Sequence, residues 1–284
     1  MEPWGGLPSP EQVAAAWQRS VRAQERADRE FRLAERYEDL AEYSGDVTHL
    51  RMGLLHRSTA TRHQVAAELL AGHARRVADS RRSGGPPPPF MTGVAEACGV
   101  GSVAVTLVDA QQNQVATASS DRSARDAQDL EYVLGEGPAR DSVLARSPVV
   151  ATGTALASRW PGYGPAFEAL GFGQVVAVPL KSAEACIGAL AVFSASSAAA
   201  PTPIVSQVAD ALTRSVFLGK DAVPGLFGDI DYRAEVHQAA GMVAVQLGCR
   251  VADALELVKA RSFADGRPIG DIARDIVDGH LKLG

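Results

Sequence analysis

Residues 230–248 read IDYRAEVHQAAGMVAVQLG, and this stretch opens the part of the chain whose fold is most strongly patterned. Its apolar residues recur at spacings of three and four, which places them on one stripe of a helix. They are Val236, Ala240, Val243 and Leu247. Gly248 follows, and glycine readily takes the left-handed conformation just past a helix end. The pattern therefore predicts a helix over Ile230–Leu247.

Two more amphipathic helices are predicted after very short connectors. The second covers Val251–Ala264 and stops at Asp265-Gly266. The third opens at Pro268, whose fixed φ and missing N–H suit a first helical turn. The inward faces of these two helices comprise Ala254, Leu255, Val258, Ile269, Ile272, Ala273, Ile276 and Val277. Helices this short close a core only by packing on one another or on a second chain.

Three short motifs on these helices carry a family resemblance. They are Gln238-Ala-Ala-Gly241, the Leu247-Gly-Cys249 turn and Asp271-Ile-Ala273. With their flanking residues they resemble an ANTAR domain, the RNA-binding module of bacterial response regulators that act as transcription antiterminators. The resemblance covers about the last fifth of the chain. The family usually has a lysine between the alanine and the glycine of the first motif, where this chain has Ala240.

The middle of the chain, from Phe90 to about Lys220, alternates between strand and helix patterns. Two hairpins are predicted, from Ser102–Val108 with Val115–Ser119 and from Gln174–Leu180 with Cys186–Phe193. The remaining predicted elements are a strand at Val149–Thr152 and helices at Ala124–Leu134, Pro165–Leu170 and Thr202–Leu218. Antiparallel hairpins with flanking helices are typical of an α+β domain.

This middle segment resembles a GAF domain over roughly 130 residues. The residues that carry the resemblance are Leu134-Gly-Glu-Gly-Pro138, Arg159-Trp-Pro161, Phe167 to Phe172, Val175–Leu180 and Ile187–Leu190. A GAF-like domain followed by an ANTAR-like domain is the order found in actinobacterial GAF and ANTAR domain-containing transcription antitermination regulators. The chain lacks the Asn-Lys-Phe-Asp-Glu set that marks cyclic-nucleotide-binding GAF domains, so that ligand is not expected.

The N-terminal part predicts long, unusually polar helices. Between Arg19 and Asp39, twelve of the twenty-one residues are charged, with acids and bases at i,i+3 and i,i+4 spacings. Ser44-Gly-Asp46 marks a break. A near-heptad apolar seam is predicted from Val47, Leu50, Leu54, Thr61, Val65 and Leu69. Such helices are either solvated or one half of a coiled coil.

The expected fold class is therefore α+β, in three parts. Residues 1–85 form an N-terminal extension of long helices, with coiled-coil character, and a linker whose four consecutive prolines make it stiff. Residues 86–220 form a GAF-like sensor domain with an antiparallel sheet flanked by helices. Residues 221–284 form an ANTAR-like RNA-binding domain of three helices.

The formal charge is −5 and is unevenly distributed. Residues 11–85 hold 13 basic and 11 acidic side chains, residues 86–220 hold 8 and 11, and residues 221–284 hold 7 and 10. The segment that resembles an RNA-binding domain is thus net acidic. Because phosphate contacts supply most sequence-independent affinity for nucleic acids, RNA binding would need a local basic face.

The resemblance implies RNA contacts from the C-terminal segment. The candidates are the basic residues Arg233, Lys259, Arg261, Arg267 and Arg274, with Gln238 and Gly241 carried over from the first motif. Aromatic residues are scarce there, so shape and hydrogen bonds would have to dominate recognition. If the family's lysine touches RNA, Ala240 removes a charge-assisted bond of about 1.5–3 kcal/mol.

Gly135, Glu136 and Gly137 are the candidates for a ligand site in the middle domain, since they precede a helix expected to begin near Ala139. Free N–H groups at a helix start attract anions. The alternative is a tight turn, because the segment lacks both glycine-rich phosphate-binding patterns.

His49, His56 and His63 recur every seven residues. Seven helical residues rise about 10.5 Å, so no two of them share a metal ion within one chain. They are expected to line a solvated or interfacial stripe, such as a pH-sensitive dimer seam. No metal and no cofactor are predicted.

Catalysis is not expected. The chain has no Gly-x-Ser-x-Gly elbow and no His-Glu-x-x-His motif, and its paired acids fall in charged helix expected to be solvated. These acids are Asp126, Asp129, Glu131 and Glu136.

The cysteines and the hydropathy of the chain indicate its cellular compartment. Cys98, Cys186 and Cys249 lie far apart and fit no zinc spacing, so they are expected to be buried thiols in a reducing compartment. No signal peptide is visible, and the longest apolar run, Cys186 to Ala200, is too short to span a membrane. A cytoplasmic protein without a membrane partner is therefore expected.

The expected function is that of a homodimeric regulator. Its GAF-like domain senses an unknown small-molecule or protein signal, and its ANTAR-like domain binds RNA hairpins in leader transcripts and favours antitermination. Two alternatives stay open. The C-terminal domain is a dimerisation or protein-docking module that has lost RNA binding, or the middle domain is a small-molecule or redox sensor with Cys98 or Cys186 reactive.

Overall fold

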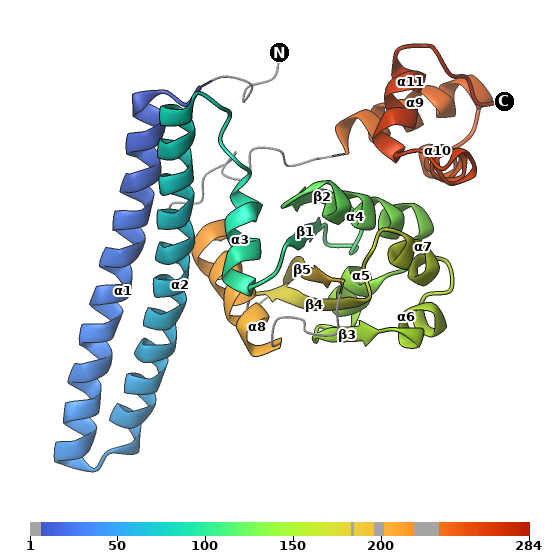
Figure 1. Cartoon of the computed structure of the whole chain (residues 1–284). Coiled ribbons are helices and arrows are strands. Elements are labelled where there is room, and N and C mark those ends of the chain that lie inside the picture. Colours follow the sequence, from blue (N-terminus) through green and yellow to red (C-terminus); the bar gives the residue numbers. More distant parts are fainter. Residues whose placement is uncertain (1–6, 183–184, 196–201, 219–232) are drawn as a thin grey trace.

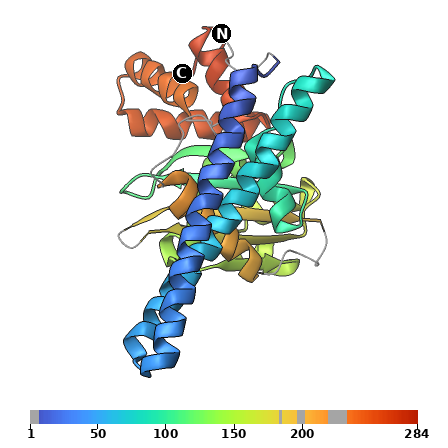
Figure 2. The same cartoon turned by 90° about the vertical axis from the view of Figure 1, so that its left-hand side faces the viewer.

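The computed structural model describes residues 7–182, 185–195, 202–218 and 233–284. These residues form an α+β structure with eleven α-helices and a five-stranded antiparallel sheet (Figure 1). A long helical hairpin lies along one side of the sheet domain and extends beyond it, and a group of three short helices sits at the other end (Figure 1, Figure 2). Within the described ranges, no helix has both the length and the apolar character needed to cross a membrane.

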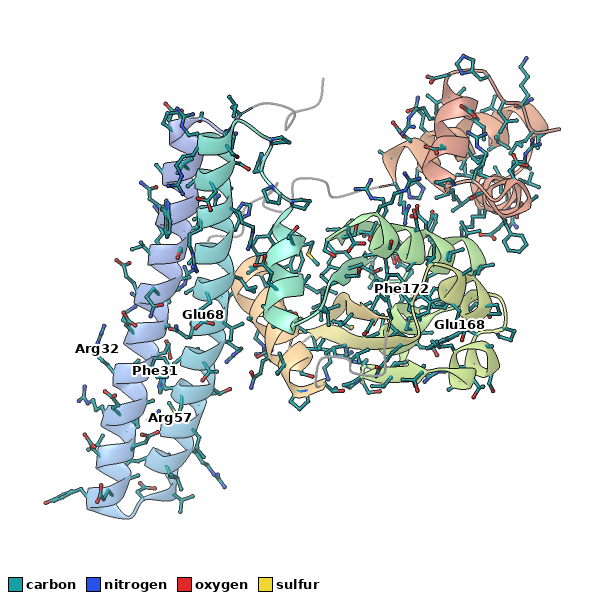
Figure 3. The ribbon with its side chains drawn as sticks, in the orientation of Figure 1. Phe31, Arg32, Arg57, Glu68, Glu168 and Phe172 are labelled. Carbon is teal, nitrogen blue, oxygen red and sulfur yellow. The ribbon has the colours of Figure 1, made fainter. Side chains whose placement is uncertain are left out.

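The hairpin consists of α1 (Pro10–Ser44) and α2 (Val47–Ser83), which pack along their lengths. Both predicted helices and the break between them are confirmed. Ser9 and Gln12 form a capping box at the start of α1, and Gly45 takes a left-handed conformation at its end. Arg57 lies on the part of the hairpin beyond the sheet domain (Figure 3) and pairs with Glu38 across the two helices.

Small residues, and not the predicted leucine seam, join the two helices. The buried small residues are Ala16, Ala23, Ala27 and Ala34 on α1, and Gly53, Ala60, Ala67 and Ala74 on α2. Val47, Leu50 and Leu54 are exposed, so the first half of the predicted seam is wrong. The coiled-coil partner of α1 is α2 of the same chain. Small side chains let two helix backbones approach closely, and the bulkier leucines are left on the outside.

The sheet has the strand order β2-β1-β5-β4-β3, and every neighbouring pair is antiparallel. The strands are β1 (Ser102–Val108), β2 (Gln114–Ser119), β3 (Val149–Thr152), β4 (Gln174–Lys181) and β5 (Cys186–Ser194). Both predicted hairpins and the short strand are confirmed. Strand β1 pairs with β5, with Val105 opposite Leu190, so the first and the last strand of the domain are neighbours in the sheet.

Helices cover both faces of the sheet, and alternate strand residues serve the two cores. One core packs Val103, Val176 and Leu190 against the hairpin and against α3 (Phe90–Cys98), α8 (Thr202–Ala211) and η1 (Leu212–Phe217). The other packs Ala104, Val175 and Phe193 against helices from the opposite face. The helices on that face are α4 (Arg122–Leu134), α5 (Pro138–Ala145), α6 (Thr154–Arg159) and α7 (Tyr163–Ala169). We call this unit, from α3 to η1, the α+β domain.

Three features of the α+β domain differ from the predicted elements. Helices α3 and α6 were not predicted, because each is under ten residues long and shows too few turns for a periodic pattern. The predicted closing helix over Thr202–Leu218 is α-helical only to Ala211 and then becomes a π-helix. Such π segments are rare and are often found at functional positions.

The C-terminal helices are α9 (Ala234–Leu247), α10 (Val251–Asp265) and α11 (Ile269–Val277). The three predicted helices are confirmed, although Ile230 and the next two residues lie outside the described ranges. Val236, Val258, Ile269 and Ile272 form part of their shared core. Leu247, the last residue of the predicted apolar stripe, is exposed at the helix end. We call α9–α11 the three-helix unit.

Candidate functional site

The α+β domain and the three-helix unit meet at a buried ion pair. Arg233, which directly precedes α9, is 1% exposed, and its Nη1 donates to Asp129 Oδ1 on α4 at 2.6 Å. The Arg233 guanidinium lies 4.7 Å from the centre of the Tyr132 ring, also on α4. A buried charge is tolerated only when it is paired, so this contact fixes where the start of α9 lies.

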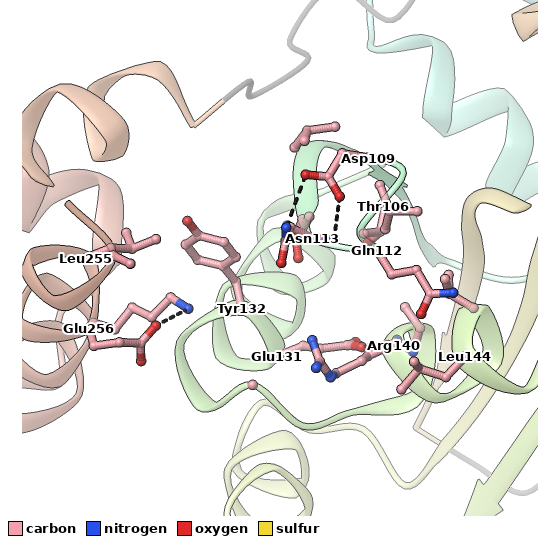
Figure 4. Close-up of a pocket in the computed structure, with 18 of the residues that line it drawn as sticks. Thr106, Asp109, Gln112, Asn113, Glu131, Tyr132, Arg140, Leu144, Leu255 and Glu256 are labelled. Atoms are coloured by element: carbon pink, nitrogen blue, oxygen red, sulfur yellow. Dashed lines mark hydrogen bonds and ion pairs between the residues drawn. The ribbon is translucent and has the colours of Figure 1, made fainter. Parts of the chain in front are cut away.

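Tyr132 belongs to the three-helix unit as much as to its own domain. It is 8% exposed and packs in the core formed by Val236, Val258 and Ile272. The Lys259 ammonium lies 4.7 Å from the centre of the same ring and pairs with Glu256 at 3.0 Å (Figure 4). We call Asp129, Tyr132, Arg233 and Lys259 the interdomain contact.

The interdomain contact covers two of the candidate RNA-binding residues and corrects one expectation. Arg233 and Lys259 were expected to contact RNA, and in this arrangement Arg233 is buried and the Lys259 side chain is only 15% exposed. Asp129 was expected in solvated helix, but it partners the buried Arg233. The sequence contains one weak indication of this contact. Asp129 and Tyr132 are three residues apart on the predicted helix, so their side chains lie on the same face.

The other basic candidates lie on the surface of the three-helix unit and are all ion-paired. Arg261 pairs with Asp265 at 2.7 Å, Arg267 with Asp275 at 2.9 Å, and Arg274 with both Asp271 and Glu235. Their side chains are roughly half exposed. Exposed pairs of this kind contribute about 0–1 kcal/mol, so a phosphate can replace the carboxylate at little cost.

The first motif of the three-helix unit divides between surface and core. Gln238 is exposed on α9, and a side chain added at Gly241 would meet open space. Ala240 is fully buried. The side chain of a lysine at this position would begin inside the core. Replacing Ala240 by lysine therefore does not simply restore a surface charge.

The turn at Gly135, Glu136 and Gly137 is closed by the chain's own carboxylates. Glu131 on α4 accepts from the backbone N–H groups of Ala139 and Arg140 at the start of α5. Glu136 accepts from the N–H groups of Gly162 and Tyr163 at the start of α7, at 2.7 and 2.9 Å.

The helix start that was predicted to attract an external anion is therefore occupied by Glu131. The arrangement corresponds to the tight-turn alternative, with Gly135 in a left-handed conformation at the end of α4. Glu131 was expected in solvated helix and is instead buried. Burial raises its pKa to about 7, although the two N–H groups favour the charged form.

A cavity of about 420 Å³ lies beside the interdomain contact and is walled by both units (Figure 4). The β1–β2 turn contributes Asp109, Gln112 and Asn113, and this turn is held by hydrogen bonds from Asn113 to Asp109. Glu131 and Arg140 line it from the α+β domain. The three-helix unit supplies His237, Leu255, Glu256 and Lys259. The cavity therefore lies where the two units meet.

The three histidines of α2 occupy different surroundings. His49 lies beside the Tyr37 ring, whereas His56 stacks on that ring and contacts Glu30 at 2.7 Å. His63 contacts Ser215 of η1 at 3.1 Å, and burial lowers its pKa. In the part of the chain that the structure describes, no three His, Cys, Asp or Glu residues gather closely enough to hold a metal ion.

All three cysteines are free thiols. Cys98 is buried in the core next to the hairpin, and burial raises its pKa to about 12. Cys186 is partly buried on β5, and Cys249 packs against the core of the three-helix unit. Because the thiolate is the reactive form, Cys98 is a poor redox sensor.

Comparison with known proteins adds no relative: neither the models of known protein families nor the curated proteins gave a match to this chain.

Proposed function

We propose that the chain is a signal-dependent RNA-binding regulator of transcription antitermination. The α+β domain, GAF-like in its motifs, receives a small-molecule or protein signal. The three-helix unit, ANTAR-like in its motifs, binds hairpins in leader transcripts. The observation that carries the proposal is that α9–α11 share a core, which Tyr132 of α4 completes, and that in the described residues this core meets the α+β domain at a contact rich in charge.

The candidate RNA-binding residues that are exposed in the described arrangement include Arg261, Arg267 and Arg274. Their carboxylate partners lie mostly three or four residues away or on the facing helix, where ion pairs are weak and exchangeable. Gln238 and Gly241 add an amide and an open backbone on α9. A dimer would present two such sets of residues together and raise affinity through effective concentration.

The test is retention of stem-loop RNA by the intact protein at two salt concentrations. Arg267→Ala should weaken retention and lower the salt dependence by about one phosphate contact. Arg82→Ala is the matched control, because Arg82 is an exposed arginine paired with Asp79 on the hairpin, remote from the three-helix unit. Equal retention by both variants would remove Arg267 from the site. No retention by the wild type at low salt would refute RNA binding.

Protein docking is the second candidate function for the three-helix unit. Val245 is 86% exposed on α9, and Met242 beside it is also exposed. Exposed apolar side chains on a net acidic unit suit a protein partner better than RNA. In that case Val245→Asp would abolish partner binding, and stem-loop RNA would not be retained at any salt concentration.

A further inference from the structure

We infer that α4 of the α+β domain occupies two of the candidate RNA-binding residues of the three-helix unit, Arg233 and Lys259, so that the described arrangement is a closed form that competes with RNA. This inference rests on the proposed function and adds its regulation. It is carried by the interdomain contact, in which Asp129 and Tyr132 engage Arg233 and Lys259.

The α4 surface offers the two chemical features that RNA offers to a protein. The Asp129 carboxylate is an anion that accepts from the Arg233 guanidinium, as a phosphate oxygen would. The Tyr132 ring is an aromatic face that meets two cations, as an unstacked base would. Since Arg233 and Lys259 cannot serve both partners at once, closure and RNA binding by these residues exclude each other.

The backbone at Arg233 makes the closed form costly to hold. Arg233 has a φ of +53°, one of only a few left-handed non-glycine residues in the described ranges. Such a conformation costs on the order of 1 kcal/mol or more and persists only when its surroundings impose it. The Arg233 side chain is held by Asp129 and Tyr132, so separation of the two units would return its charge to water.

A ligand bound in the interdomain cavity would act next to the interdomain contact. The cavity walls come from α4, α5 and the β1–β2 turn on one side and from α9 and α10 on the other, so a ligand that fits this cavity binds the closed form only. By linkage, that ligand would weaken RNA binding. If the closed form is about ten times more populated than the open one, RNA binds about ten-fold more weakly than to the free unit.

The experiment compares Asp129→Asn with Asp126→Asn in the intact chain. Asp126 is the matched control because it lies on the same helix and makes only a long contact of 3.8 Å with the exposed Arg122. Domain separation is measured by small-angle X-ray scattering and by hydrogen exchange at the start of α9. RNA affinity is measured with a pool of stem-loops of randomised loop sequence.

We expect Asp129→Asn to increase the radius of gyration, to speed exchange at the start of α9 and to tighten RNA binding several-fold, whereas Asp126→Asn changes none of these. The charge swap Asp129→Arg with Arg233→Asp should restore the compact form, which separates loss of the contact from general unfolding. A compact Asp129→Asn protein overturns the inference.

Different results would contradict competition by α4 and RNA binding itself. If wild type and Asp129→Asn bind RNA equally while the variant is more open, RNA binding stands and competition by α4 is overturned. If neither the wild type nor Asp129→Asn binds RNA at low salt, the proposed RNA binding is refuted. Competition between α4 and RNA is then refuted too, whatever the scattering shows.

Discussion

Buried carboxylates organise the α+β domain at the residue scale. Glu131 lies in the last turn of α4, and its carboxylate accepts from the first N–H groups of α5, where the helix dipole favours a negative group. Glu136 makes the same contact with the first N–H groups of α7. Two acids therefore position two helices through hydrogen bonds from backbone N–H groups, and these acids already hold the N–H groups that an added anion would use.

Glu131 predicts a measurable pH dependence. Its carboxyl has an ordinary pKa of 4.5, which burial raises to about 7 in the folded protein. A group whose pKa rises on folding stabilises the fold at low pH, and this contribution disappears as the pH rises through about 7. Relative to Glu131→Gln, the wild type should lose on the order of 3 kcal/mol of stability between about pH 4.5 and pH 7.

Urea unfolding of both proteins at several pH values between about 4 and 8 measures this difference. Glu136→Gln is the control, because Glu136 also caps a helix but is less buried. A stability difference between wild type and Glu131→Gln that stays constant with pH would contradict the assignment.

The backbone of Gly137 lies so close to the Glu131 side chain that an added Cβ should lower the stability of the fold. Its φ is +155°, and a Cβ there would lie 2.6 Å from Glu131 side-chain atoms. Gly137→Ala should therefore destabilise the protein by about 2–3 kcal/mol, through both strain and collision. Gly135→Ala is the matched control. It also sits at positive φ but meets nothing within 4 Å, so it should cost about 1 kcal/mol. Equal thermal midpoints would rule out the close contact.

Small residues decide the packing at the scale of elements. The α1–α2 seam is made of alanines and Gly53, and the hairpin's leucines point away from it. The hairpin in turn packs on α8 and η1, where His63 meets Ser215 and Arg62 pairs with Asp210. The hairpin is thus attached to η1, which is the last element described before α9.

Overpacking the seam should loosen the hairpin. Ala60 is fully buried between the helices, so Ala60→Leu forces them apart and should cost about 1–3 kcal/mol. Leu54→Ala changes an exposed leucine six residues earlier on α2 and should stay within about 0.5 kcal/mol of the wild type. Circular dichroism melts of the two variants measure the difference. A larger effect from Leu54→Ala would mean that this leucine is covered by another molecule in solution.

The whole molecule has two attached parts, the hairpin and the three-helix unit, which lie at the left and at the upper right of the α+β domain in Figure 1. The free end of the hairpin carries Val47, Leu50, Leu54 and Leu55, all about half exposed or more. An unpaired apolar surface on a helical hairpin suits association with a second copy, which would form a four-helix bundle.

The proposed dimer predicts a change of mass. The double substitution Leu50→Glu and Leu54→Glu places two carboxylates on this surface and should convert the dimer to a monomer without unfolding the α+β domain. Light scattering after size exclusion measures the mass. Val150→Glu is the control, since Val150 is a comparably exposed apolar residue on β3 of the α+β domain. A wild-type protein of monomer mass would refute the dimer.

The elements of this protein were largely determined by the sequence alone. The two hairpins of the sheet, the break at Gly45 and the three C-terminal helices follow from periodicity and turn residues, which act within about ten neighbouring residues. The two missed helices, α3 and α6, are too short for that signal.

Only the tertiary structure decided which charged groups are buried and which surfaces meet. Asp129 and Arg233 pair across 104 residues, and either looks like an ordinary surface charge in its own helix. The same holds for Glu131, and for the alanine seam that displaced the leucines of α2. A local pattern records which face of a helix is apolar, but the burial of a charge depends on partners that the fold brings together.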